Sequence, residues 1–427
     1  MRQTPFSAAL AGISVFGFAV RVTYVELFSS HIRFGLDTTW YHLVSQTVAS
    51  GRGFLDPGKY FGEHVSVPTA FRPPLYPVFL AVVTRLFDTS AHTLQIAGCL
   101  GGVLTIAMIG YLGRRVGGPA VGLVAAALAS VYPIFLAVDA SLMSETLYVP
   151  LVTGAVLSVY RAIERPSIPR WLLVGALTGA CVLTRGDGLV LLVVLVVPAV
   201  WLAAPVPWDR RALLAAASIA ACGLVLVPWT ARNERRLGVG TVATLQSGTA
   251  LAGSNCAATY YGERVGSWSY ACTERPDQAH LSEARFNSEL RRDGRRYLLD
   301  HAERLLVVVP VRILRQWGLF DPVEQARIDA IESRNMSWQI FSWIAYLPVA
   351  ALAVYGFVLL RARRVLVLPM LAVVAAVTIS AAVVYGGQRF RSSVEPILVV
   401  AAAVAVVHLA GRLRAAPVPM KETAATL

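Results

Sequence analysis

One early acidic residue and four distant arginines are the residues of this chain best suited to chemistry. Asp37 lies in Gly35-Leu36-Asp37-Thr38-Thr39-Trp40-Tyr41-His42, just beyond the first long apolar segment. A carboxylate in such a place can take a proton from a hydroxyl group, or hold a divalent cation or an arginine. The arginines, which bind phosphate through a planar fork of donors, are Arg72, Arg185, Arg389 and Arg391. Together these residue types indicate chemistry on a phosphate-bearing substrate.

Further candidates accompany them. Glu145, with Asp139 as second choice, joins two apolar segments through Val138-Asp139-Ala140-Ser141-Leu142-Met143-Ser144-Glu145. Trp40, Tyr41, His42 and His64 share a polar loop with Asp37 and are candidates to line a pocket. Two of the candidate residues also have a purely structural interpretation. Asp37 is also suited to cap a helix that begins at Trp40, and Arg185 is also suited to pair with Asp187 or to extend toward the membrane surface.

The elements that must position these residues are membrane helices. The 427 residues are 56% hydrophobic and only 15% charged, and the mean hydropathy is +0.60. A span of about 20 apolar residues crosses the hydrocarbon of a bilayer, and such spans must be helical. We predict an all-α polytopic membrane protein with about ten transmembrane helices, at roughly 8–28, 91–112, 118–137, 142–161, 171–185, 188–204, 211–230, 338–360, 365–385 and 394–411.

Arginine placement predicts the orientation. Pairs and clusters such as Arg114 with Arg115, and Arg210 with Arg211, fall in short loops, which the positive-inside rule places in the cytoplasm. These loops all lie on the cytoplasmic side only if the short apolar stretch 74–87 does not cross the membrane. The segment 305–320 is interrupted by Pro310, Arg312 and Arg315 and is placed on the outer surface. Both termini are then cytoplasmic, and two large loops, 29–73 and 231–337, face outward and carry juxtamembrane helices.

This topology divides the chain into three parts. Residues 1–230 form an N-terminal transmembrane catalytic module that includes the first external loop, 231–337 is an extracytoplasmic loop, and 338–427 holds C-terminal transmembrane helices with a short cytoplasmic tail. Cys256 and Cys272 share the external loop, so a disulfide is expected in an oxidising compartment, with two unpaired thiols as the alternative. The net charge of +13 reflects mainly cytoplasmic arginines facing lipid headgroups, and no nucleic-acid partner is predicted.

The order of these features resembles the GT-C glycosyltransferases, most closely the branch with protein O-mannosyltransferases and the lipid A aminoarabinose transferase. The features are the early Asp37, Arg72-Pro73-Pro74-Leu75-Tyr76-Pro77, Ser144-Glu145, Leu183-Thr184-Arg185-Gly186, Val227-Pro228-Trp229 and Gln388-Arg389-Phe390-Arg391. The resemblance covers residues 8 to about 233 and resumes near 385. It departs from the family where Thr38, not a second acid, follows Asp37, and it leaves the second external loop unexplained.

The resemblance implies an inverting transfer of a sugar from a polyprenyl-phosphate carrier to an extracytoplasmic glycan, lipid or protein. Asp37 matches the base that takes the acceptor proton, and Glu145, with Asp139 in reserve, matches an acid that orients the site or binds a metal in some members. Arg185, Arg389 and Arg391 would hold the carrier phosphate. No cofactor is assigned with certainty, although the acids would also suit a divalent cation.

A lipid-borne donor also agrees with the residues that are missing, since the sequence contains no Asp-x-Asp pair and no glycine-rich phosphate loop for a nucleotide sugar. Mannose and arabinose are the first sugars to test, and the bacterial inner membrane is the expected location. The aromatic and amide residues of 253–272 are candidates for acceptor recognition. An O-antigen-type glycan polymerase or ligase is the alternative function. A secondary transporter is less favoured because its charges would lie near the membrane midplane.

Overall fold

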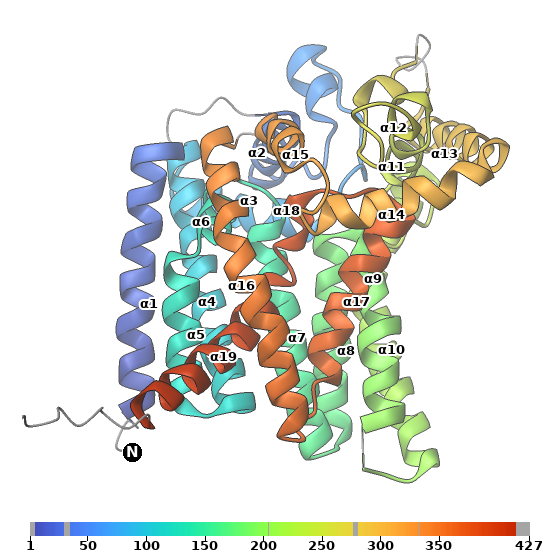
Figure 1. The fold of residues 1–427 in the computed structure, drawn as a ribbon. Coiled ribbons are helices and arrows are strands. Elements are labelled where there is room, and N and C mark those ends of the chain that lie inside the picture. Colours follow the sequence, from blue (N-terminus) through green and yellow to red (C-terminus); the bar gives the residue numbers. More distant parts are fainter. Residues whose placement is uncertain (1–4, 30–34, 204, 276–280, 333, 416–427) are drawn as a thin grey trace, which may run out of the picture.

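The computed structural model describes residues 5–29, 35–203, 205–275, 281–332 and 334–415, and these residues are almost entirely helical (Figure 1). Their helices in the first half of the chain are α1 Pro5–Tyr24, α2 Leu36–Ala49, α3 Leu75–Leu86, α4 Ala91–Gly117, α5 Pro119–Val131, α6 Pro133–Ala140, α7 Glu145–Glu164, α8 Ile168–Thr184, α9 Leu189–Leu191 and α10 Trp208–Leu237. In the second half they are α11 Ser247–Ser254, α12 Ala257–Tyr260, α13 Glu283–Asp300, α14 Leu305–Gln316, α15 Pro322–Ala330, α16 Met336–Ala362, α17 Leu368–Val383, α18 Gln388–Arg391 and α19 Glu395–Ala415. The predicted positions of the two termini lie outside the described residues.

The long apolar helices make this a multi-pass membrane protein. By length and composition, six helices of the described ranges can cross a membrane: Phe6–Ser29, Ala91–Gly117, Glu145–Glu164, Trp208–Leu237, Met336–Ala362 and Glu395–Leu413. The helix pair α5 and α6 is a seventh candidate, bent by 57°. Pro133 explains the bend, because a proline removes one backbone donor and its ring clashes with the preceding turn.

Helix length and composition therefore support six or seven crossings, and not the ten that were predicted. The segments predicted at 171–185, 188–204 and 365–385 form shorter apolar helices, Ile168–Thr184, Gly186–Leu202 and Leu368–Val383. A 17-residue helix is only about 25 Å long, less than the roughly 30 Å of hydrocarbon. These shorter helices nevertheless run beside the longer ones, with α8 between α7 and α10 (Figure 1).

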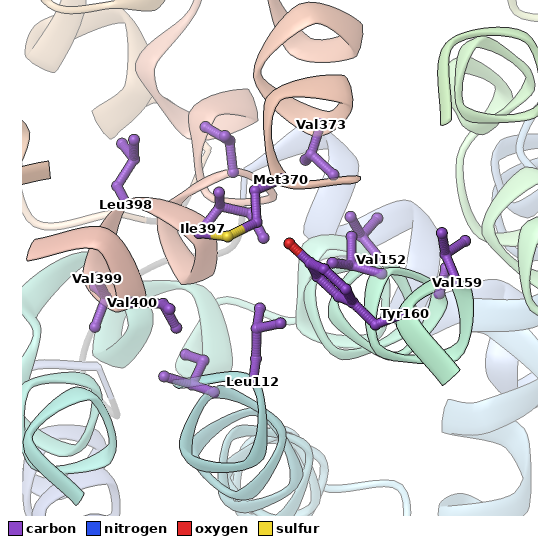
Figure 2. Packing of buried hydrophobic residues seen from close by; sticks show 14 of the residues in the cluster. Leu112, Val152, Val159, Tyr160, Met370, Val373, Ile397, Leu398, Val399 and Val400 are labelled. Atoms are coloured by element: carbon purple, nitrogen blue, oxygen red, sulfur yellow. The ribbon is translucent and has the colours of Figure 1, made fainter. Parts of the chain in front are cut away.

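A continuous apolar core holds the bundle together. Leu112 of α4, Val152 of α7, Met370 of α17 and Val400 of α19 belong to one buried cluster (Figure 2). Tyr160 is buried in the same cluster and satisfies its hydroxyl by donating to the Leu366 carbonyl oxygen at 2.6 Å. Because a protein interior is close-packed, this core fixes the ends of helices that are far apart in the sequence.

The two ends of the bundle differ in character. The short helices α2, α11, α12, α13, α14 and α15 gather at the end opposite the start of α1 (Figure 1). A disulfide joins Cys256, which precedes α12, to Cys272. The arginine-rich turns, including Arg115 paired with Glu164, lie at the other end. The long polar segments and the clustered arginines are thus separated by the length of the helices.

Candidate active site

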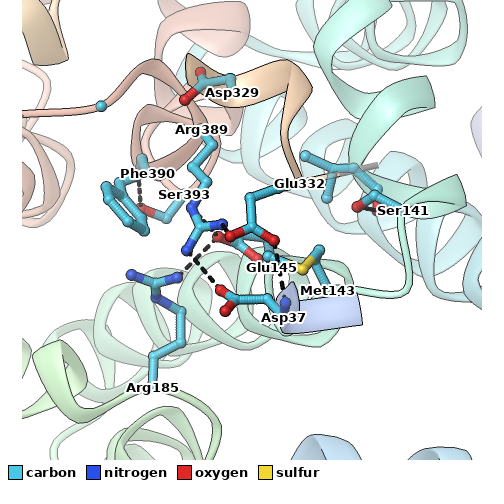
Figure 3. Close-up of polar contacts among 12 residues, drawn as sticks. Asp37, Ser141, Met143, Glu145, Arg185, Asp329, Glu332, Arg389, Phe390 and Ser393 are labelled. Atoms are coloured by element: carbon cyan, nitrogen blue, oxygen red, sulfur yellow. Dashed lines mark hydrogen bonds and ion pairs between the residues drawn. The ribbon is translucent and has the colours of Figure 1, made fainter. Parts of the chain in front are cut away.

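Asp37 lies in the first turn of α2, where its carboxylate contacts two arginines. Arg72 Nη2 donates to one carboxylate oxygen. Arg389 Nη2 donates to the other at 3.2 Å (Figure 3). The helix begins at Leu36 with Gly35 as its N-cap and without a side-chain capping bond. The expectation that Asp37 caps a helix starting at Trp40 is therefore wrong, because the helix starts four residues earlier. The Asp37 carboxylate instead contacts arginines that are distant from it in the sequence.

Glu145 forms a second group with two arginines. It is the first residue of α7, is 1% exposed, and accepts a hydrogen bond from Arg185 Nη1 at 2.9 Å. Arg389 Nε is 3.7 Å from the same Glu145 oxygen. Arg389 therefore connects Asp37 and Glu145, two acids that are more than 100 positions apart in the sequence (Figure 3).

Arg185 follows the last residue of α8 and has two acidic partners. Its Nε and Nη2 donate to the two carboxylate oxygens of Asp187, each at 3.1 Å, while Nη1 reaches Glu145. Its guanidinium also lies over the rings of Tyr148 and Phe390, at 5.4 and 4.7 Å from their centroids. The local pairing with Asp187 and the long-range pairing with Glu145 thus coexist.

Aromatic rings surround Arg72. Its guanidinium carbon lies 5.9 Å from the Trp40 ring centroid, 5.3 Å from that of Tyr41 and 5.4 Å from that of Phe71. Positions 37 and 41 are one helical turn apart, so Asp37 and Tyr41 approach Arg72 from one face of α2. Trp40 and Tyr41 therefore lie against the arginine that pairs with Asp37, and their part in lining a pocket stays a prediction.

Burial and charge set the protonation of the site. Burial alone would raise the pKa of Asp37, but Arg72 and Arg389 hold this pKa below its usual value. The pKa of Glu332, a neighbour whose Oε2 accepts the backbone N–H of Asp37 at 3.2 Å, is raised by burial and by the charge of Asp37. Burial acts to lower the pKa of Arg389, but Glu145 and Asp37 raise it well above its usual value. Asp37 is therefore ionised and Arg389 cationic at neutral pH.

Four predicted site residues lie outside the acid–arginine cluster, which consists of Asp37, Arg72, Glu145, Arg185 and Arg389. Asp139 pairs with Arg21 at 2.7 Å, and Arg391 pairs with Glu395 at 2.6 Å. His42 Nε2 lies 2.7 Å from the Thr89 carbonyl oxygen, and His64 is in an exposed loop. The spacing of Arg391 and Glu395, four residues apart, indicated their pairing in advance. Arg21, a charge inside an apolar segment, required an acidic partner such as Asp139.

The connection between α15 and α16 contributes residues that the sequence patterns did not single out. Glu332 Oε1 lies 4.0 Å from Arg389 Nη1. Arg334 is 4% exposed and interacts electrostatically with Glu145 and Asp329. The signal was a charged stretch, Asp329, Glu332 and Arg334, immediately before a long apolar segment.

The cluster does not provide a set of metal ligands. Among the described residues, no group of three or more His, Cys, Asp or Glu side chains could hold a metal ion. The carboxylates of Asp37, Glu145 and Glu332 instead surround the guanidinium of Arg389. These carboxylates form ion pairs with an arginine, and we assign no step to a metal.

Solved structures with a similar fold include an archaeal oligosaccharyltransferase. The oligosaccharyltransferase of Archaeoglobus fulgidus in its apo form aligns with a TM-score of 0.58 at 15% identity, covering 97% of this chain and 51% of that chain. Its complex with an inhibitory peptide and a dolichol-phosphate aligns with a TM-score of 0.56 at 14% identity, covering 97% and 52%. The chain thus spans about half the length of these proteins, and the likeness concerns the fold.

A third structure, ArnT from Cupriavidus metallidurans bound to undecaprenyl phosphate, aligns with a TM-score of 0.41 at 15% identity, covering 97% of this chain and 81% of that chain. Comparison with curated protein sequences gives no match.

A protein-family model matches part of the chain. Residues 71–230 match the family model of dolichyl-phosphate-mannose-protein mannosyltransferases. The matched segment runs from Phe71 to Thr230 and includes Arg72, Glu145 and Arg185. The predicted resemblance to GT-C glycosyltransferases of the mannosyltransferase branch is confirmed for this part of the chain.

Proposed function

We propose that the protein is an inverting glycosyltransferase that moves a sugar from a polyprenyl-phosphate carrier to a hydroxyl group of an extracytoplasmic acceptor. One observation carries the proposal. Asp37, Glu145, Arg72, Arg185 and Arg389, from five separate parts of the chain, meet at one end of a membrane-helix bundle. The family match of residues 71–230 supports a lipid-phosphate sugar as the donor.

The proposed mechanism is a single displacement at the anomeric carbon. The Asp37 carboxylate takes the proton from the acceptor hydroxyl, and the acceptor oxygen forms a bond to the anomeric carbon. The bond between that carbon and the phosphate oxygen breaks, and the carrier phosphate leaves with the electron pair. Attack opposite to the leaving group inverts the configuration.

Arginines assist the departure of the phosphate. Arg185 contacts Glu145, Arg72 contacts Asp37, and Arg389 contacts both acids. Fixed cations in a site with little water stabilise negative charge as it grows on the leaving oxygen. Glu145 acts as a positioning residue, because its Oε1 orients both Arg185 and Arg389.

The arrangement in the membrane is also a proposal. We place the end with α2 and α11–α15 outside the cytoplasm of a bacterial inner membrane, since the arginine-rich turns lie at the other end. Ten crossings result if the bent pair α5 and α6 and the three shorter apolar stretches all cross. The boundaries remain 1–230, 231–337 and 338–427.

The acceptor is assigned to the disulfide-linked segment 253–272. Tyr261 and Tyr270 are 46% and 50% exposed there, and Trp268 lies 6.4 Å from Tyr385, centroid to centroid. Tyr385 is close to the charge of Arg389. Aromatic rings of this kind stack on sugars and other planar or apolar groups, so the segment is placed to present an acceptor to the cluster.

Reconstitution of the wild-type protein tests the function. Proteoliposomes are given radiolabelled mannose or arabinose on undecaprenyl phosphate, with an extract of cell-envelope glycans, lipids and proteins as acceptors. Transfer of label with release of undecaprenyl phosphate is expected, and a nucleotide-linked sugar is expected to give none. Polymerisation of lipid-linked repeats would favour the polymerase alternative. Uptake without any transfer would favour a transporter and contradict the proposal.

A further inference from the structure

Most arginines of the cluster are already neutralised by carboxylates. Arg72 pairs with Asp37, Arg185 with Glu145 and Asp187, and Arg389 with Asp37 and Glu145. A phosphate that binds any of them must compete with a carboxylate that is already in place. The predicted fourth member, Arg391, is committed to Glu395 and stacks on Tyr346.

Arg334 differs from these arginines. Its Nε, Nη1 and Nη2 are buried, and none has a hydrogen-bond partner among the residues that the structure describes. A guanidinium carries five N–H donors and is charged at any physiological pH. A buried charge without a partner is costly to the folded protein. A buried guanidinium whose nitrogens make no hydrogen bonds therefore calls for a functional explanation.

The surroundings of Arg334 place it at the cluster. Glu145 and Asp329 act on its charge as attractive neighbours, and Arg389 acts as a repulsive one. Glu145 Oε2 and Asp329 Oδ2 are likewise buried and have no hydrogen-bond partner within the described ranges. Neither acid is within ion-pair distance of Arg334 in the described structure, whereas Glu145 directs its other oxygen to Arg185.

The backbone next to Arg334 adds a second attraction for an anion. Arg334 directly precedes Asn335, the N-cap of α16, a helix of 27 residues. The Asn335 side chain accepts the Trp338 N–H, but other amides of the first turn point in the same direction. The positive end of a helix dipole favours negative charge close to these amides.

We infer that Arg334 binds the phosphate of the polyprenyl carrier, beside the acid–arginine cluster and at the start of α16. This inference rests on the proposed function. The phosphate binds here without displacing a carboxylate, and it supplies the acceptor oxygens that the three unpartnered nitrogens lack. Arg334 thus takes the place among the phosphate-binding residues that the sequence assigned to Arg391.

The test compares two lipids that differ only in the phosphate. Full-length protein in nanodiscs is titrated with undecaprenyl phosphate and with undecaprenol, and binding is followed by intrinsic tryptophan fluorescence and by melting temperature. The variants are Arg334→Met and Arg334→Lys. Arg327→Met is the matched control, because Arg327 lies on the adjacent helix α15 with a side chain that is 64% exposed.

Wild type and Arg327→Met are expected to prefer undecaprenyl phosphate. Arg334→Met is expected to lose about 10- to 150-fold of this preference, the range for a hydrogen-bonded charge. Arg334→Lys should keep part of the preference, since it retains the charge without the planar fork. In nanodiscs without undecaprenyl phosphate or undecaprenol, Arg334→Met should melt at or above the wild-type temperature, because the substitution removes an unpaired buried charge.

Three results would overturn the inference, and they separate it from the proposed function. Full preference for the phosphate in Arg334→Met would show that this residue does not bind it. Unfolding or a clear loss of melting temperature in Arg334→Met nanodiscs that contain neither undecaprenyl lipid would make Arg334 a structural residue. A wild-type protein that does not distinguish the two lipids would remove the proposed donor itself and, with it, this assignment.

Discussion

At the scale of single residues, Asp37 has the contacts expected of a general base held ready by cations. Its two oxygens face Arg72 and Arg389, so the carboxylate is fixed in orientation and ionised. In the proposed displacement, the arginines that hold the acid also stabilise the phosphate that leaves. The same residues therefore link the two halves of the proposed displacement.

Replacing Asp37 by Asn should abolish most of the transfer without unfolding the protein. The amide keeps the size of the side chain but cannot take the acceptor proton, so kcat is expected to fall by about 10²- to 10⁴-fold. Initial rates of sugar release from the lipid donor measure the effect, and the melting temperature reports folding. Asp300→Asn, at an exposed position of α13, serves as the control. An Asp37→Asn protein with the wild-type rate would exclude Asp37 as the base.

The pH dependence of transfer should reveal the arginines that act on Asp37. Its pKa is lowered in the folded protein, because Arg72 and Arg389 outweigh the effect of burial. Activity that needs the ionised form is then present above this lowered pKa and is lost only as the pH falls through it. Arg72→Gln removes one cation, so the pKa of Asp37 rises and the acid limb of the kcat profile moves to higher pH.

Rate profiles from acidic to neutral pH compare this variant with the wild type. Arg285→Gln, at a position with a side chain that is 71% exposed, should leave the acid limb in place. An acid limb that stays where it is in Arg72→Gln would mean that another group controls the rate.

At the scale of elements, a buried ion pair fixes the bend that precedes the site. Arg21 Nε of α1 donates to Asp139 Oδ2 of α6 at 2.7 Å, and Arg21 also donates to carbonyl oxygens of Ala129 and Ser130 on α5. These contacts hold α1, α5 and α6 together on both sides of the break at Tyr132. The turn that leads from α6 to Glu145 starts from this anchored position.

Asp139→Ala is therefore expected to affect stability and not the chemistry. Leaving Arg21 buried without its partner should destabilise the protein by about 3 to 5 kcal/mol, whereas the double variant Arg21→Met, Asp139→Leu should recover much of the loss. Thermal unfolding in detergent measures this, with Asp209→Ala at an exposed position as the control. A stable Asp139→Ala protein with a strongly reduced kcat would return Asp139 to the catalytic site.

At the scale of the whole molecule, the bundle separates an arginine-rich end from an end with long polar segments. The acid–arginine cluster lies at the second end, close to α2, α15 and α18 (Figures 1 and 3). A carrier lipid with its phosphate at headgroup level can reach such a cluster from one leaflet only. The orientation of the protein thus decides which compartment supplies the acceptor.

Single cysteines test this orientation. Tyr261→Cys is expected to react with a membrane-impermeant maleimide in intact cells, and Arg364→Cys only after the membrane is opened, since both positions are exposed at opposite ends of the bundle. The background is low because Cys99, Cys181 and Cys222 are buried. The reverse labelling pattern would place the cluster in the cytoplasm and contradict the proposed acceptor side.

The sequence by itself determined the helical membrane class and most of the acid–arginine cluster. Long apolar segments leave the backbone no alternative to helix in lipid, and charges beside them are rare enough to attract attention, as with Arg185 and Arg389. Helix ends were harder to predict. Pro133 breaks one predicted span into α5 and α6, and the helix of Asp37 starts before the predicted position.

Only the tertiary structure decided which charges are partners. Asp139 and Glu145 lie six positions apart and look alike in the sequence, yet one faces Arg21 and the other Arg185. Arg391 lies two residues from Arg389 but faces Glu395. Arg334 was recognised only in the structure, where its buried guanidinium nitrogens have no hydrogen-bond partner among the described residues. Ion pairs depend on distances of a few ångströms between side chains, and in a helix bundle those distances are set by packing between segments that are remote in the chain.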